Sequence, residues 1–329
     1  MKYVTMKAVL NESWCFMTKE KLQYMVGGLL YMPAFQTNIV DKIKSNAIAD
    51  LTSIAFCLED AIRDEALDEA EDVLCNTLHK LTNVDNLPLI FIRIRTPAHL
   101  QKIHNRLSDV SNIITGYILP KFDLNNAEYY AAMVYSINRN LKKPFYVMPI
   151  LETEMIADIF NRNDNLVKIK KILDVIKNYV LNIRIGVNDL SALYGLRRDI
   201  NHTVYDIGVL RDIFVTVINI FAKDYIVASS VWNYFNGKGW QDGLINELQM
   251  DRLNGFIGKS AIHPAQLPYI YDSLKITQAD LKDAEQILNW QSASHGVAKI
   301  EGRMNELNCH TKWAQRIKML SEVYGVKDV

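Results

Sequence analysis

The chain has 329 residues, of which 49% are hydrophobic and 22% are charged, an ordinary composition for a globular protein long enough to form one large barrel with additions. Lysine plus arginine and aspartate plus glutamate each number 37, so the formal net charge is zero and we expect no nucleic-acid partner. No apolar run approaches the roughly 18 residues of a membrane span, and the N-terminus lacks the apolar core of a signal peptide. The four cysteines form no Cys-x-x-Cys pair, so we expect reduced thiols in a cytoplasmic protein with no membrane association.

A regular alternation of apolar runs and helix-sized segments organises residues 29–275. Residues 1–28 precede it as an N-terminal extension that we predict to be partly helical. The apolar runs are 29–32, 53–58, 89–94, 117–119, 145–151, 183–187, 225–228 and 256–262. The segments between them that predict helices include 37–46, 64–81, 126–138, 164–178, 205–221 and 244–253. The pattern predicts an α/β protein with a (β/α)₈ TIM barrel, and eight regular units favour this closed form over an open doubly wound sheet.

Residues 276–329 follow the barrel as a C-terminal helical arm or lid. A helix is expected over 277–290, and residues 292–303 are small, polar and punctuated by glycine, which predicts a loop or hinge. The last helical segment carries apolar residues near a 3.6-residue spacing at Trp313, Ile317, Leu320 and Val323. We expect this stripe to dock across a subunit boundary in a homo-oligomer, with folding back onto its own barrel as the alternative.

Two carboxylates stand at the ends of two successive predicted strands. Glu152 follows the apolar run 145–151, and Asp189 follows the run 183–187. The active site of a TIM barrel lies at the carboxyl ends of its strands, so both side chains should reach the same face. A pair of carboxylates with room for water and substrate oxygens suits Mg²⁺. The alternative is that each residue only caps the helix that follows it.

Further charged residues are predicted at the ends of strands two and three. Glu59 and Asp60 directly follow a buried run, where two acids are unfavourable unless they are paired or bind a cation. Arg93 and Arg95 lie on one face of the third strand, in the segment FIRIR. An arginine inside an apolar strand should meet an anion, which is either a bound substrate or one of the acids of strand two.

Strands four and eight end in basic residues. Lys121 follows Leu-Pro at the end of strand four and could bind substrate or simply be solvated at the rim. His263 follows strand eight and could bind substrate or have a structural role. Lys259 lies within strand eight, which leaves Schiff-base chemistry as a weaker alternative. The sequence contains no zinc-protease, paired-cysteine or nucleophile-elbow motif.

The ordered set of strand ends resembles the citrate lyase β-subunit-like branch of the HpcH/HpaI aldolase superfamily, which also contains malyl-CoA lyases. The nearest relatives look like a divergent subgroup of carbon–carbon bond lyases. The similarity runs from Leu29 to about Gln266 and is weaker as far as Trp313. The matching segments are LLYMPA, LEDAI, IRI, LPK, PILET, IGVNDLS and GFIGKSAIHPAQ. Each is short, and their specificity comes from seven segments in the right order.

This resemblance implies a Mg²⁺- or Mn²⁺-dependent lyase that acts on a small 2-oxo acid or hydroxyacyl substrate through an enolate. It implies that Glu152 and Asp189 bind the metal and that Arg93 binds the substrate carboxylate and stabilises the enolate. Glu59 and Asp60 are implied to lie next to that site. The family's C-terminal Gly-x-Met-x-Asp motif, whose acid reaches a neighbouring subunit, corresponds here to a segment that ends in Glu306.

The chain also departs from the family pattern. Ala34-Phe35 replaces the usual Gly-Asn or Gly-Ser pair after the first strand, and an acidic segment, DEALDEAED, replaces basic positions after LEDAI. These changes argue against a coenzyme A thioester as the substrate, although the metal and arginine positions are intact. The alternatives to a lyase are a thioester hydrolase on the same site and a catalytically inactive barrel that serves as a binding or assembly component.

Overall fold

The computed structural model describes residues 17–48, 51–291, 296–300 and 302–327. Most of the predicted N-terminal extension and part of the predicted loop at 292–303 lie outside these ranges. No helix in the described ranges is both long enough and apolar enough to cross a membrane.

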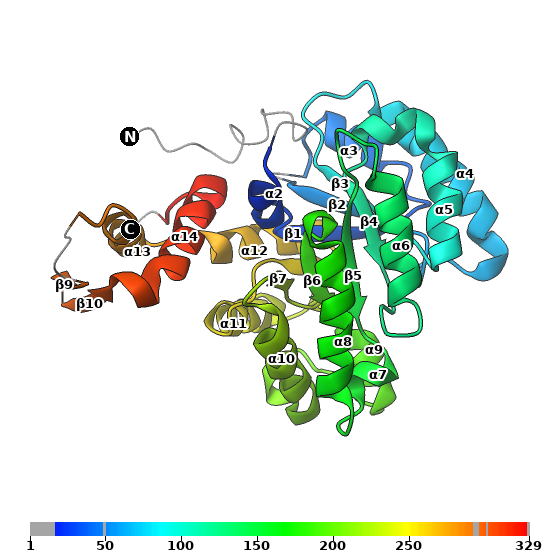
Figure 1. Ribbon diagram of the computed structural model, residues 1–329. Helices are drawn as coiled ribbons and strands as arrows, with labels where there is room; N and C mark the ends of the chain where they lie inside the picture. The colour runs from blue at the N-terminus through cyan, green and yellow to red at the C-terminus, as the bar shows by residue number, and fades with distance from the viewer. Residues whose placement is uncertain (1–16, 49–50, 292–295, 301, 328–329) are drawn as a thin grey trace.

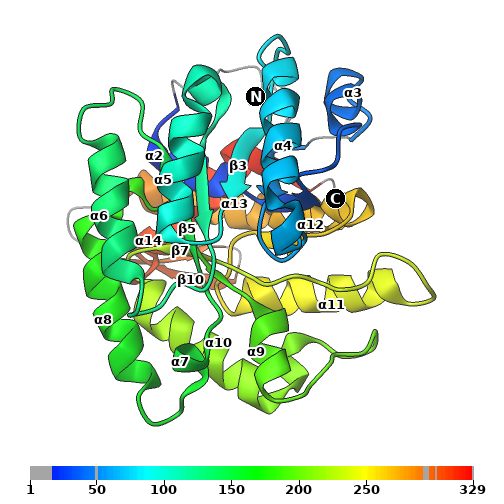
Figure 2. The same cartoon turned by 90° about the vertical axis from the view of Figure 1, so that its right-hand side faces the viewer.

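Eight parallel strands form the centre of the protein, and helices lie around them (Figures 1 and 2). The strands are β1 (Gly28–Pro33), β2 (Ser53–Cys57), β3 (Leu89–Arg93), β4 (Gly116–Leu119), β5 (Tyr146–Leu151), β6 (Asn182–Ile185), β7 (Ile226–Ala228) and β8 (Lys259–Ala261). Their spatial order is β7-β6-β5-β4-β3-β2-β1-β8. Each predicted apolar run thus overlaps a strand, because a parallel strand covered on both faces needs apolar side chains on both.

The barrel closes between β7 and β8. A parallel bridge joins Ser229 to Lys259, and the Ser229 backbone N–H donates to the Gly258 carbonyl oxygen at 2.9 Å. The Ile257 N–H donates to the Val227 carbonyl oxygen at 2.9 Å. The predicted TIM barrel is therefore confirmed, and the open doubly wound sheet is excluded.

Helices follow the strands in the alternation that the sequence predicts. They are α2 (Lys19–Met25), α3 (Ile39–Lys44), α4 (Leu67–Leu81), α5 (Pro97–Arg106), α6 (Ala127–Asn138), α7 (Glu154–Ala157), α8 (Arg162–Val175), α9 (Val187–Leu193), α10 (Gly208–Phe221), α11 (Trp240–Leu253) and α12 (Leu267–Leu274). Local sequence sets some of their boundaries. For example, α5 begins with a proline, and the Thr96 side chain accepts a hydrogen bond from the His99 N–H at 3.1 Å.

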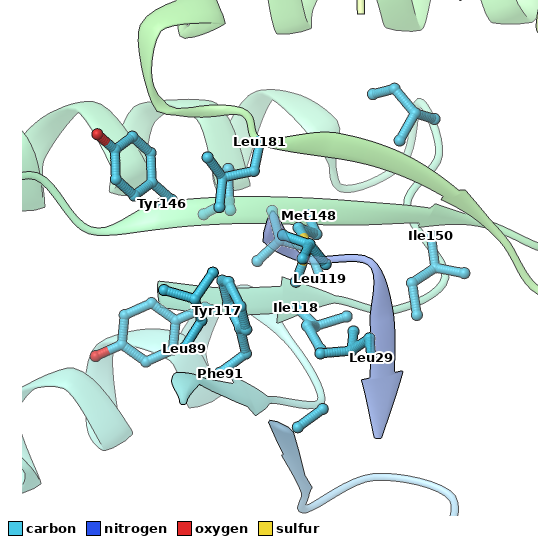
Figure 3. Close-up of a cluster of buried hydrophobic side chains, with 14 of the residues drawn as sticks. Leu29, Leu89, Phe91, Tyr117, Ile118, Leu119, Tyr146, Met148, Ile150 and Leu181 are labelled. Carbon is cyan, nitrogen blue, oxygen red and sulfur yellow. The ribbon is translucent and has the colours of Figure 1, made fainter. Parts of the chain in front are cut away.

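The interior of the barrel is filled by large apolar side chains from neighbouring strands. Figure 3 shows part of this cluster, in which Leu29 of β1, Ile118 of β4 and Met148 of β5 come together. All three side chains are buried. The packed interior fixes the strand ends, and therefore the polar residues that follow them, relative to one another.

The C-terminal arm consists of α13 (Gln278–Leu288), a hairpin of β9 (Val297–Ile300) and β10 (Arg303–Glu306), and α14 (Leu307–Tyr324), all to one side of the barrel (Figure 1). The hairpin corrects our prediction of a loop over 292–303. Its turn contains Gly302 with a φ of 80°, a left-handed conformation that glycine adopts readily. The antiparallel register pairs Arg303 with Ile300 and Glu306 with Val297.

The apolar stripe of α14 packs within its own chain. Ile317, Leu320 and Val323 are buried, and the helix contacts α2, α12 and α13. The Tyr324 hydroxyl donates to the Tyr24 carbonyl oxygen at 2.7 Å. Our expectation that this stripe crosses a subunit boundary is therefore wrong for the stripe itself. The helix docks on its own barrel because neighbouring helices of the same chain offer a complementary apolar face.

Candidate active site

Glu152 lies immediately after β5 and is only 4% exposed. One carboxylate oxygen, Oε1, accepts a hydrogen bond from the Lys121 backbone N–H at 2.8 Å. Space for the other oxygen depends on Gly186 at the end of β6. A Cβ atom at position 186 would lie 1.8 Å from Glu152 Oε2, so only glycine fits there. The glycine of the segment IGVND thus has a steric role beside the carboxylate.

Asp189 approaches Glu152 from the neighbouring strand–helix junction. It lies in the first turn of α9 (Val187–Leu193), and β6 ends at Ile185, two residues before the predicted end of the strand at residue 187. Its side chain is 33% exposed and lies within hydrogen-bonding reach of the Glu152 carboxyl group. The structure therefore brings together the two carboxyl groups that the sequence placed at successive strand ends.

The proximity of these carboxyl groups changes their titration. Burial first, and the charge of Asp189 second, raise the pKa of Glu152 to about 8. Burial and the charge of Asp60 also raise the pKa of Asp189. The pair consequently holds a proton near neutral pH, because two adjacent carboxylates in a buried site repel each other. A divalent cation would replace this proton and remove the repulsion.

The donor set fits Mg²⁺ rather than a transition metal held by several side chains. Within the described ranges, no group of three or more His, Cys, Asp or Glu side chains is placed to hold a metal ion. Mg²⁺ is commonly held by one or two carboxylates, with waters and substrate oxygens completing its coordination. Glu152 and Asp189 provide this kind of set.

Arg93 lies at the end of β3 and is paired with both acids of the second strand end. Its Nη2 lies 3.1 Å from Glu59 Oε2 and 3.1 Å from Asp60 Oδ2. Its Nε and Nη2 also lie 3.2 and 3.0 Å from the sulfur of Cys57. The structural ion pair that we considered as the alternative for Arg93 therefore exists, and the same guanidinium also lines the cavity described below.

Lys121 connects these acids to the carboxyl pair. Its ammonium group bonds Glu59 and lies 3.3 Å from Asp60 Oδ1 and 3.9 Å from Asp189 Oδ1. Its backbone has a φ of 48°, which is uncommon for a residue with a side chain. Two sets of contacts hold Lys121 in this conformation: its ammonium group binds the acids at the end of β2, and its backbone N–H donates to Glu152. Backbone strain is therefore located at the candidate site.

A cavity of about 390 Å³ opens at this end of the barrel. Its lining includes Glu152, Asp189, Asp60 and Arg93 from the predicted set. It also includes Tyr31, Cys57, Arg184 and Ser260, which our sequence reasoning did not select. A larger cavity of about 1140 Å³ lies elsewhere, between α11, α12 and α14, and contains none of the predicted site residues.

Arg184 is the main residue that the sequence reasoning missed. It lies in the middle of β6, within the segment IRIG, and is only 1% exposed. The signal was available, because an arginine in an apolar strand is the same feature that drew attention to Arg93. Burial lowers the pKa of Arg184.

Three other basic residues lie away from the cavity. The His263 ring stacks on Phe235 with centroids 4.6 Å apart, and its Nδ1 accepts a hydrogen bond from the Ala265 N–H. Arg95 donates to the Leu58 carbonyl oxygen at 2.6 Å and so holds the loop after β2. Lys259 is buried between Glu247 and Asp251 of α11, at 2.8 Å from each, so its side chain points out of the barrel and cannot serve a Schiff-base mechanism in the cavity.

Glu306 also lies outside the cavity of its own chain. It is at the junction of β10 and α14, where its backbone N–H donates to His310 Nδ1 at 3.0 Å. The Cys309 thiol donates to its carboxylate at 3.2 Å. Any role for Glu306 at the carboxyl pair would therefore require a second subunit.

Comparison with known proteins identifies the family. The sequence profile described as C-C_Bond_Lyase of the TIM-Barrel fold matches residues 20–326. The chain belongs to this family of carbon–carbon bond lyases. The match supports the sequence-based resemblance to citrate lyase β-subunit-like proteins, and it covers the barrel and the C-terminal arm. A comparison of this chain with curated protein sequences found no match.

Solved structures support the fold of this C-C_Bond_Lyase family member. A citrate lyase from Burkholderia xenovorans LB400 aligns with a TM-score of 0.69 and 15% identity over 92% of this chain and 93% of that one. Protein CitE from Mycobacterium tuberculosis, in complex with magnesium, acetoacetate and coenzyme A, aligns with a TM-score of 0.61 and 20% identity over 90% and 97%. A citrate lyase β subunit from M. tuberculosis, complexed with oxaloacetate and magnesium, aligns with a TM-score of 0.52 and 20% identity over 77% and 98%.

Proposed function

We propose that the protein is a Mg²⁺-dependent carbon–carbon bond lyase that cleaves or forms a bond next to the carbonyl group of a small 2-oxo acid or hydroxyacyl compound. The buried carboxyl pair of Glu152 and Asp189 carries this proposal. Two adjacent acids in a buried position are unfavourable without a cation. A catalytically inactive barrel does not require such a pair, so its presence favours an enzymatic function over a binding or assembly role.

Glu152 and Asp189 would hold the ion, with Mn²⁺ as the alternative to Mg²⁺, and the ion would polarise the carbonyl oxygen and stabilise enolate charge. The guanidinium of Arg93, whose side chain is only 12% exposed, contributes a second positive charge at the cavity wall. Glu59 and Asp60 orient Arg93, and they fix the ammonium group of Lys121 beside the same cavity. Magnesium complexes of the M. tuberculosis proteins support this choice of ion.

In the cleavage direction, the substrate hydroxyl loses its proton to a base, and the electron pair of the breaking carbon–carbon bond enters the enolate. A proton added at the enolate carbon then completes the second product, so protons balance over the reaction. The same intermediate serves the reverse aldol addition. A coenzyme A thioester remains the alternative substrate, supported by the coenzyme A complex of the M. tuberculosis protein, and thioester hydrolysis remains the alternative reaction.

Exchange of substrate protons with solvent tests enolate formation without knowledge of the physiological substrate. We expect the purified protein with Mg²⁺ to accelerate deuterium incorporation into the methyl group of pyruvate or of acetyl-CoA, followed by NMR in D₂O. Removal of the metal with EDTA should return exchange to the rate without protein. Absence of exchange with pyruvate, 2-oxobutyrate and acetyl-CoA would argue against an enolate-forming lyase.

We also propose that Glu306 acts in a neighbouring subunit of a homo-oligomer, where it gives or takes the proton at the enolate carbon. Its position outside its own cavity is compatible with this role. Mixed oligomers of Glu306→Gln and Glu152→Gln subunits should recover part of the exchange activity, because some sites would then receive both intact residues. Verified mixed oligomers without recovery would show that Glu306 does not act across subunits.

A further inference from the structure

Arg184 has a buried guanidinium whose partners are all neutral. Its Nη2 donates to Ser260 Oγ at 2.8 Å, and its Nη1 donates to Asn182 Oδ1 at a weaker 3.4 Å. The Tyr31 hydroxyl lies within hydrogen-bonding reach. Its Nε has no hydrogen-bond partner. Because the residue is 1% exposed, water cannot solvate this charge fully.

Other buried arginines of the protein differ in this respect. Arg93 pairs with Glu59 and Asp60, Arg162 with Asp212 at 2.5 Å, and Arg198 with Glu247. Over the described part of the chain, Arg184 forms no ion pair with a carboxylate. A buried cation without a counter-charge is strongly unfavourable. The missing counter-charge should therefore come from a bound molecule.

We propose that Arg184, together with Ser260 and Tyr31, forms an anion subsite that binds a second acidic group of the substrate. This inference rests on the proposed function and specifies its substrate class as dianionic 2-oxo acids. The three residues come from β6, β8 and β1, and all of them line the cavity that contains Glu152 and Asp189. The 2-oxo acid end of the substrate would lie at the carboxyl pair and the distal acidic group at Arg184.

The division of roles between the two cavity arginines follows from their partners. Arg93 is paired with two acids, whereas the partners of Arg184 within the described residues are neutral and leave its charge available to a ligand. The burial of Arg184 limits the group that reaches it to a small oxyanion at the end of a short chain. A cavity of about 390 Å³ holds such a molecule. Carboxylate and phosphate share the required chemistry, and a guanidinium binds both in a bidentate manner.

Titration calorimetry in the presence of Mg²⁺ tests the subsite by comparing oxaloacetate and 2-oxoglutarate with pyruvate and 2-oxobutyrate. We expect the wild-type protein to bind at least one dianion more tightly than the monoanion of matching length. Arg184→Met should lower affinity for that dianion roughly 10- to 100-fold, the range for a lost charge-assisted contact, and leave monoanion affinity nearly unchanged. Its melting temperature should stay the same or rise, because an unpaired buried cation is removed.

Two further variants complete the design. Arg211→Met removes an exposed arginine of α10 and is the matched control, with no expected change in any affinity. Ser260→Ala should weaken dianion binding in the same direction as Arg184→Met, and it provides the test if Arg184→Met does not fold. 3-Phosphonopyruvate distinguishes the two oxyanions, since tighter Arg184-dependent binding than that of oxaloacetate would assign a phosphate-like group to the subsite.

Two outcomes would overturn the proposal. One is an equal loss of monoanion and dianion affinity in Arg184→Met, which would place Arg184 at the common carboxylate. The other is a lower melting temperature with unchanged affinities, which would make Arg184 structural. Malonate binding without metal separates this inference from the proposed function. If malonate binding depends on Arg184 while no 2-oxo acid binds with Mg²⁺, the subsite stands and the proposed reaction fails.

Discussion

Glu152→Gln and Asp189→Asn should each abolish Mg²⁺ binding and metal-dependent proton exchange while leaving the fold intact. The two carboxyl groups lie within hydrogen-bonding reach, so each substitution removes one of the two charged ligands from the same position. In the metal-free protein, Glu152→Gln should not lower the melting temperature, because it removes a buried acid whose ionisation is opposed by its neighbour. Calorimetry with Mg²⁺ and circular dichroism measure the two effects separately.

Glu154→Gln is the matched control, since Glu154 is exposed and only two residues away. It should retain Mg²⁺ binding and exchange activity. Equal Mg²⁺ affinity in the wild-type protein and in both site variants would show that the metal binds elsewhere.

The raised pKa of Glu152 gives this prediction a pH dependence with a defined sign. The folded-state pKa of about 8 exceeds the model-compound value of 4.5, so the metal-free folded protein binds this proton more tightly than the unfolded chain. The resulting stabilisation is fully present below about pH 4.5 and is lost as the pH rises to about 8. Over this window, the melting temperature of the wild-type protein should fall relative to that of Glu152→Gln. Mg²⁺ affinity should rise over the same window, because the ion must displace the proton.

Gly186→Ala should disrupt the site almost as severely, although position 186 carries no functional group. The added Cβ would lie 1.8 Å from Glu152 Oε2 and 2.6 Å from Glu152 Cβ, so the Glu152 side chain has to move. We expect loss of Mg²⁺ binding together with a fall of about 1–3 kcal/mol in the free energy of unfolding, the usual range for overpacking. Denaturant titration and calorimetry measure these quantities.

Gly208→Ala provides the comparison for this substitution. A Cβ at position 208 meets no atom within 4 Å, and the residue begins α10. Alanine there should leave Mg²⁺ binding unchanged and should not reduce stability. If Gly186→Ala behaves like Gly208→Ala, then Glu152 has alternative positions and its placement is not fixed by β6.

The barrel and the carboxyl pair could be predicted because both follow from short-range sequence signals. Strands such as β2 and β5 are buried along their whole length, so their apolar runs mark them without ambiguity. Parallel strands in a barrel end on the same face, and this topological rule alone brought Glu152 and Asp189 together. The requirement for glycine at position 186 arises from Glu152, which follows the neighbouring strand β5. The segment IGVND, which contains Gly186, therefore does not reveal this requirement by itself.

Features that depend on side-chain direction or on distant partners could not be predicted. In β8 both faces are covered, so the sequence does not reveal that Lys259 points outward to α11 while Ser260 points into the cavity. The two strands of the hairpin, β9 and β10, are short and polar. Their sequences lack the apolar–polar alternation that would have predicted strands. The apolar stripe of α14 was recognised correctly, but a stripe does not specify which surface it will cover.

The distribution of charge around the cavity has a consequence for the order in which ligands arrive. Four carboxyl groups, from Glu59, Asp60, Glu152 and Asp189, face three cationic side chains, from Arg93, Lys121 and Arg184. Because the carboxyl pair holds a proton near neutral pH, these charges balance in the empty cavity, which then does not attract an acidic substrate. Binding of a divalent ion displaces this proton and leaves one net positive charge among these groups, so the same cavity then attracts the substrate. Association should therefore be sequential, with the metal preceding the acid, and high metal concentration should accelerate substrate capture.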